Sequence, residues 1–359
     1  MNLPPVGRLP LLILGFIALF TGVGAGLARL GWTMPEIAAS SAANHGALMV
    51  CGFFGVVIAL ERAVAIARLW AYLGPLLAGL GTASAVHGRY DVALALYLGA
   101  SLVLLGGSLD IVRRQPALFT VTIALGAASW GIGNLLALLG ASAPVVVPWW
   151  LAFLILTIAG ERLELSRFMQ PSPGAQRQFA FVLALCTAGL AGIAMAWGPY
   201  LFAIGLLALA AWLLRNDIAR RTVHQQGLTR FIAVCLLSGY AWLLVGAAVL
   251  LFVGELAPGS PAYDAIVHAL GMGFVFSMVF GHAPIIFPAV LRVKVPYHPS
   301  FYGPLFVLHV ALILRLGGDA LGEFALIRAG GLLGAIALAA FIASTVGAVI
   351  RGALGGRRT

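Results

Sequence analysis

Two histidines in apolar stretches of the chain share the same pattern of neighbours. His45 and His268 are each followed, after three intervening residues, by a methionine. These methionines and the glycines and phenylalanines beside them are Met49, Gly52 and Phe53 after the first histidine, and Met272, Gly271 and Phe274 around the second. An imidazole in hydrocarbon must find a hydrogen-bond partner or bind something. Both histidines are therefore candidate ligands of a metal ion or of a haem iron.

The position of the two histidines favours haem. Each lies near the start of an apolar run, and both runs are predicted to start on the same side of a membrane, so the imidazoles have similar depth. Two histidines from different helices can then ligate one haem iron axially. At about 100° per residue, Gly52 lies almost under His45 and Gly271 lies close to His268, which leaves room for a flat macrocycle. Phe53 and Phe274 are the predicted apolar walls of a haem b site.

The same residues also fit ordinary packing. Methionine, phenylalanine and glycine at helical spacing are common where membrane helices meet. A purely structural role is therefore the alternative to haem ligation for His45 and His268.

His282 is a third candidate metal ligand. It lies about 21 Å beyond His268 along one helix at 1.5 Å per residue, so the two cannot bind the same metal ion. Pro284 and Pro288 follow it and are expected to break the helix, which frees backbone carbonyls. His282 is predicted either to satisfy such a carbonyl or to serve a second haem, a copper ion or a proton path.

The remaining histidines and the cysteines carry less chemistry. His87, His224 and His298 fall in short polar turns and are expected to be solvated, and His309 lies within an apolar run, where we expect a structural hydrogen bond. The three cysteines have no CxxC spacing, which argues against a disulfide framework or a thiolate metal site. They are Cys51, Cys186 and Cys235, and we expect them to be packing residues.

Composition shows what must position these residues. The 359 residues are 62% hydrophobic and 9% charged, which is too apolar for a soluble domain. One span takes about 20 apolar residues. An open strand edge in lipid would leave backbone groups unpaired, so we expect each span to be a helix. We therefore predict one all-α transmembrane domain over 1–359. Its twelve helices are expected at 9–30, 42–66, 70–87, 92–112, 117–140, 145–163, 178–197, 199–214, 230–254, 262–290, 300–316 and 324–350.

Charge predicts the orientation. With twelve spans, all but four of the 21 Lys and Arg residues fall on one side; the exceptions are Arg29, Arg89, Arg315 and Arg328. The positive-inside rule then predicts that both termini are cytoplasmic. We expect the chain in the inner membrane of a bacterium. The formal net charge of +10 is therefore a topology signal and predicts no nucleic-acid partner. A Pro-rich piece at 170–174 divides the chain into six helices on each side.

The pattern resembles a known family. Twelve helices, a His-x-x-x-Met-x-x-Gly-Phe run from His45 in helix two, and a helix ten that carries His268 and ends in Phe280-Gly281-His282 are similar to the NnrS family, which is related to subunit I of haem-copper oxidases. In that superfamily helices two and ten supply the ligands of a low-spin haem, which implies His45 and His268 here. No histidine lies between His87 and His224, so the resemblance implies no copper centre of the oxidase type.

The expected function is electron transfer or the handling of nitric oxide and nitrosative stress by a haem protein, with a membrane or periplasmic redox partner. A twelve-helix secondary transporter is one alternative, although its carboxylates lie near predicted helix ends. A copper-binding or copper-transporting protein that uses the His-x-x-x-Met pairs is another, because imidazole and thioether suit copper. No catalytic residue and no phosphate-binding loop is predicted.

Overall fold

A computed structural model describes residues 2–166 and 172–355, and within them the regular structure is helical, which confirms the all-α prediction. The α-helices are α1 (Pro5–Arg29), α2 (Glu36–Ala39), α3 (His45–Ala47), α4 (Gly55–Ile66), α5 (Leu73–Val86), α6 (Tyr90–Arg114), α7 (Leu118–Leu138), α8 (Ala143–Ser166), α9 (Pro173–Ala191), α10 (Gly198–Asn216), α11 (Ala219–Thr222), α12 (Gly227–Val253), α13 (Pro261–His268), α14 (Ser277–Leu291), α15 (Tyr302–Leu321) and α16 (Phe324–Gly355). Short 3-10 turns are η1 (Ala42–Asn44), η3 (Leu69–Tyr72) and η6 (Pro299–Phe301), and two π-helical segments are η2 (Leu48–Phe54) and η5 (Ala269–Phe276).

Eleven helical stretches in the described residues are long and apolar enough to cross a membrane, so the chain is a multi-pass membrane protein. They fall where eleven of the twelve spans were predicted, and the second, Ala42–Ile66, has the predicted bounds. The exception is the stretch predicted at 178–197. There α9 begins earlier, at Pro173, and its first turns carry Gln176, Arg177 and Gln178, which lower its apolar content below that of the others.

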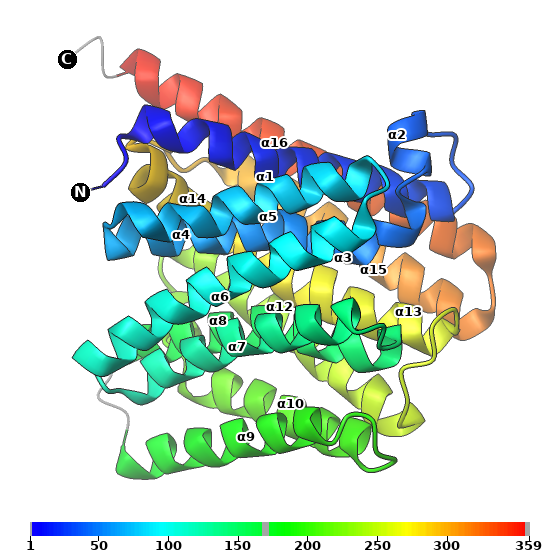
Figure 1. Cartoon of the computed structure of the whole chain (residues 1–359). Coiled ribbons are helices and arrows are strands. Elements are labelled where there is room, and N and C mark those ends of the chain that lie inside the picture. The colour runs from blue at the N-terminus through cyan, green and yellow to red at the C-terminus, as the bar shows by residue number, and fades with distance from the viewer. Residues whose placement is uncertain (1, 167–171, 356–359) are drawn as a thin grey trace. The chain divides into compact units, whose positions relative to one another are not determined.

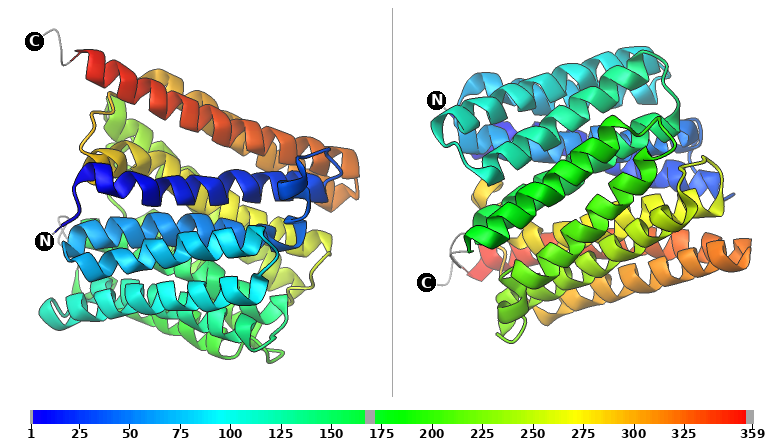
Figure 2. Two further views of the ribbon diagram at one scale, coloured as in Figure 1. Left: turned by 45° about the horizontal axis from the view of Figure 1, so that its top comes forward. Right: turned by 90° about the horizontal axis from the view of Figure 1, so that it is seen from below.

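The chain divides into two compact units, Met1–Glu161 and Arg162–Thr359, and the boundary falls within α8. In the first unit α1 packs against η2, α4 and α5, and α5, α6 and α7 pack in sequence order (Figure 1). In the second unit α9 and α10 form one helical hairpin and α15 and α16 form another, visible in green and in orange to red in Figure 2. Residues 170 and 171 of the Pro-rich piece lie outside the described residues.

Large aromatic side chains fill the interior of each unit. In the first, Trp130 on α7 stacks on Phe153 of α8 with ring centroids 4.8 Å apart. In the second, Phe280 on α14 stacks on Phe341 of α16 at 3.9 Å. These rings are buried, so each unit has its own apolar core.

Two expectations about the second unit are wrong. Helix α14 continues through Pro284 and Pro288 to Leu291, although we expected it to break there. Helix α15 continues past its predicted end at 316 to Leu321, so Arg315 lies inside the helix, where it is buried. In hydrocarbon an interrupted helix exposes several unpaired backbone groups, whereas a helix that continues past a proline loses few bonds.

Candidate functional site

His45 opens the α-helical part of its span, directly after the 3-10 turn η1. Its ring lies on α1, where Nδ1 is 2.7 Å from the carbonyl oxygen of Gly22. Gly26 makes room for the ring, since a Cβ atom there would stand 2.8 Å from Cε1 of His45. A carbonyl can only accept a hydrogen bond, so Nδ1 donates and Nε2 carries the lone pair. This is the tautomer in which Nε2 can ligate a metal.

The residues after His45 pack tightly. The Met49 side chain also lies on α1, because a Cβ atom on Gly22 would stand 2.8 Å from its sulfur. Phe53 is buried, with its ring centroid 4.8 Å from that of Phe54. A Cβ atom on Gly52 would meet Thr82 Oγ1 at 2.7 Å, so a side chain of α5 occupies the space that we expected to be open beneath His45.

His268 is the last residue of α13, and the residues at the start of this helix fix where the helix begins. Ser260 caps the helix by accepting a hydrogen bond from the backbone nitrogen of Tyr263, and Pro261 occupies the first turn. One turn before the histidine, Asp264 supplies two acceptors to Nδ1, its carbonyl oxygen at 2.8 Å and Oδ1 at 3.3 Å. His268 therefore has the same tautomer as His45.

The surroundings of His268 differ from those of His45. No atom lies within 4 Å of the position that a Cβ atom on Gly271 would take, so this glycine borders open space. The Met272 side chain packs against Gly334 of α16. Phe274 is fully buried, with its centroid 6.4 Å from that of Tyr240. The position beside Gly271 is thus open, whereas the position beside Gly52 is filled.

Both histidines lead directly into π-helical segments. His45 is followed within three residues by η2, and His268 is followed at once by η5. A π-helical hydrogen bond spans one residue more than an α-helical one, and π-helical turns are frequent at functional sites. Sequence reasoning missed these segments because it assumed α-helical periodicity throughout both spans.

The other histidines are sorted by which ring nitrogen carries hydrogen. In His282, Nδ1 donates to the Met278 carbonyl oxygen at 2.7 Å, the tautomer suited to ligation through Nε2. His87 makes the same bond to Ala83 at 2.8 Å on an exposed turn, so the bond alone does not mark a ligand. His309 is the opposite case. Trp242 donates to its Nδ1 at 3.0 Å, which leaves the hydrogen on Nε2 and makes it unsuited to bind a metal there.

A charged cluster beside His268 was also missed. Arg315 on α15 donates to both carboxylate oxygens of Asp264, with Nε to Oδ2 at 2.7 Å and Nη2 to Oδ1 at 2.8 Å. Asp319 lies one turn beyond Arg315 on α15 and is 8% exposed. The sequence held one signal for this cluster, which was its spacing. Asp264 and His268 are four residues apart and share a helix face, and the same is true of Arg315 and Asp319.

A family model described as Domain of unknown function (DUF8744) matches residues 8–350. The chain belongs to this family. No curated protein matches the chain.

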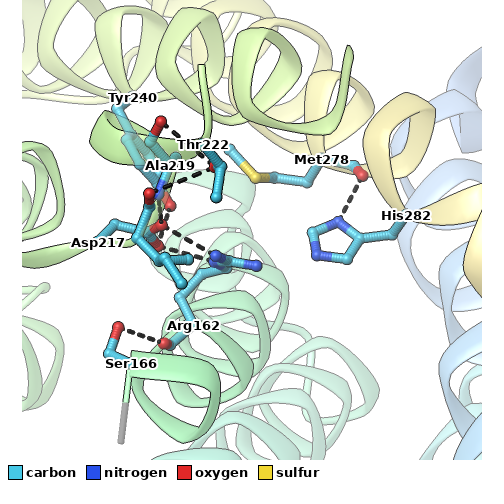
Figure 3. Close-up of polar contacts among 9 residues, drawn as sticks. Arg162, Ser166, Asp217, Ala219, Thr222, Tyr240, Met278 and His282 are labelled. Atoms are coloured by element: carbon cyan, nitrogen blue, oxygen red, sulfur yellow. Dashed lines mark hydrogen bonds and ion pairs between the residues drawn. The ribbon is translucent and has the colours of Figure 1, made fainter. Parts of the chain in front are cut away.

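This DUF8744 chain buries a second charged cluster in its second unit. Asp217 accepts from Arg162 twice, at 2.8 and 2.9 Å, from Tyr240 Oη at 2.8 Å and from the Ala219 backbone nitrogen at 2.7 Å. Figure 3 shows the guanidinium of Arg162 pointing toward the ring of His282. Arg162 is 3% exposed and Asp217 2%, so this ion pair is held inside the protein.

In the described part of the DUF8744 chain, no group of three or more His, Cys, Asp or Glu side chains could hold a metal ion. The three cysteines are buried and free. A haem iron, in contrast, takes four ligands from its macrocycle and needs only one or two from the protein.

Proposed function

We propose that this DUF8744 chain is a haem-binding protein of the bacterial cytoplasmic membrane, in which His45 and His268 are ligands of haem b iron. The observation that carries the proposal is shared by the two histidines. Each donates through Nδ1 to a backbone carbonyl, which orients Nε2 as a ligand, and each leads into a π-helical segment.

The residues around the two histidines fit a haem. Gly46 follows His45 directly and Gly271 lies three residues after His268, and a Cβ atom on either glycine would meet nothing within 4 Å, which supports the proposal. Phe53 and Phe274 are buried apolar side chains that exclude water. When bound, the haem would supply a one-electron couple. The protein's own contribution is to orient the two imidazoles.

The finer architecture is also part of the proposal. We propose α9 as a twelfth span, a bundle similar to subunit I of haem-copper oxidases, and cytoplasmic termini. The resemblance to NnrS proteins supports a role in electron transfer or in handling nitric oxide, with a membrane or periplasmic redox partner. His282 has the ligand tautomer and is the residue proposed for a second haem.

The test is to purify the full chain in detergent from haem-replete cells and to record oxidised and reduced absorption spectra with iron, copper and haem contents. We expect a Soret band, and we expect His45→Ala and His268→Ala each to lower the haem content per chain. His87→Ala is the matched control, since His87 makes the same Nδ1 bond on an exposed turn. This control should retain the wild-type spectrum.

Each outcome decides between functions. If His282→Ala removes part of the haem and leaves the spectrum of the rest, His282 serves a second haem. A colourless, iron-free wild-type protein would exclude the haem proposal. Copper that is lost in His45→Ala and Met49→Ala would replace it with the copper-binding alternative, and absence of both metals would leave the transporter alternative.

A further inference from the structure

Four polar side chains form a small array on two neighbouring helices of the second unit. Asp264 and His268 lie one turn apart on α13, and Arg315 and Asp319 lie one turn apart on α15. Helices α13 and α15 pack together, and the two pairs meet at their contact. Charged side chains inside membrane helices are energetically costly and are usually retained for a function.

Arg315 fixes the carboxylate of Asp264. Its Nε and Nη2 donate to Oδ2 and Oδ1 at 2.7 and 2.8 Å, a bidentate geometry that holds both oxygens. The arginine side chain is 11% exposed and the aspartate side chain 28% exposed. The carboxylate thus has a single defined orientation.

The oriented carboxylate faces His268. Nδ1 of His268 lies 3.3 Å from Oδ1 of Asp264 and 2.8 Å from the carbonyl oxygen of the same residue. His45 has a different partner, because its Nδ1 meets the carbonyl oxygen of Gly22. Nδ1 of His268 thus has a carboxylate beside it in addition to a carbonyl, whereas Nδ1 of His45 meets a carbonyl.

We infer that Asp264, held by Arg315, is a positioning residue that sets the donor strength of His268 and thereby the reduction potential of its iron. The inference rests on the proposed function. A carboxylate beside the N–H of a ligating imidazole makes the ring a stronger donor and favours the oxidised metal. Because the carboxylate is fixed by two bonds from Arg315, the effect depends on both residues.

The test compares midpoint potentials of the haem-loaded full chain. Asp264→Asn keeps the side-chain volume and removes the charge, so we expect haem to be retained and the potential to rise. A tenfold loss of preference for oxidised iron would raise it by about 59 mV for one electron. Asp264→Glu should return the potential toward the wild-type value. Asp110→Asn is the matched control, because Asp110 pairs with Arg114 at 2.7 Å at a more exposed site.

An unchanged potential in a haem-loaded Asp264→Asn protein would overturn the inference. If that variant does not fold, Arg315→Lys keeps the positive charge but loses the fork, and it should give a smaller rise; no rise would again overturn the inference. If the wild type binds no haem, the proposed function fails on its own. Nitrogen-15 NMR of labelled histidine in the haem-free chain then tests the contact between His268 Nδ1 and the Asp264 carboxylate. The His268 signal is assigned as the one that is absent in His268→Ala. Asp264→Asn should shift this signal, and an unshifted signal would refute the contact.

Discussion

The ring of His45 lies so close to Gly26 that a Cβ atom on this glycine would stand 2.8 Å from Cε1 and 3.0 Å from Nδ1. The same ring bonds to Gly22, one turn earlier on α1. Two glycines of the first span therefore decide where the imidazole of the second span can lie. This contact gives a direct way to displace the proposed ligand without changing it.

Gly26→Ala should reduce haem binding. Alanine favours a helix over glycine by about 1 kcal/mol, so α1 itself should not be weakened. The new methyl group would instead push the His45 ring away from its bond to Gly22. We expect a lower haem content per chain with little change in thermal stability. Gly106→Ala in α6, where nothing lies within 4 Å, is the control; equal haem contents in the two variants would contradict the role of the contact.

Gly271→Leu tests the open space beside His268. Since no atom lies within 4 Å of a Cβ atom at this position, the haem-free protein should accept the larger side chain. A macrocycle beside His268 would compete with the leucine, so haem content should fall while the unfolding temperature stays near that of the wild type. Gly303→Leu, at a similarly open position on α15, should leave haem content unchanged. Full haem occupancy in Gly271→Leu would place the macrocycle elsewhere.

Deletion of Val50 tests the π-helical segment η2. A π-helical hydrogen bond spans one residue more than an α-helical one, so removing one residue can restore a regular helix with both flanks in phase. Deleting Val103 from the regular helix α6 would instead rotate everything after it by about 100°. We expect the Val50 deletion to fold with reduced haem content and the Val103 deletion to misfold. Comparable yields and unfolding temperatures for the two deletions would show that η2 is not such an insertion.

Span positions were predictable because length and hydropathy determine them. The second predicted span has the bounds of the structure, and all eleven candidate spans lie where apolar runs were found. The end of one helix was predicted wrongly because of a charged residue. Arg315 was taken as the end of a span, but Asp264 on another helix neutralises it, and the helix continues. Such a partner is distant in sequence and cannot be recognised from hydropathy.

The candidate site was predictable only in part. The His-x-x-x-Met pattern identified two histidines that the structure places in the same tautomer. The surroundings of Gly52 were not predictable, because the π-helical segment changes the angle between successive residues and α5 supplies Thr82 from another part of the chain. Periodicity arguments hold only while the helix stays regular.

The buried ion pair of Arg162 and Asp217 gives the strongest expected effect on stability. Asp217 accepts four hydrogen bonds, two of them from Arg162, so Asp217→Asn leaves a buried guanidinium without its counter-charge. Loss of one member of a buried pair costs about 3–5 kcal/mol. The exposed pair of Asp110 and Arg114 is the control, for which a loss of about 0.3–0.5 kcal/mol is expected.

A double-mutant cycle separates the pair energy from other effects. Arg162→Met with Asp217→Leu removes both charges, so the double variant should be more stable than either single one, with a coupling energy of about 0.5–3 kcal/mol. Unfolding can be followed with a thiol-reactive fluorophore, because Cys51, Cys186 and Cys235 are all buried in the folded protein and become reactive only when it opens. Additive losses in the double variant would mean that the two charges do not stabilise each other, and the four bonds to Asp217 would then be only a consequence of the fold.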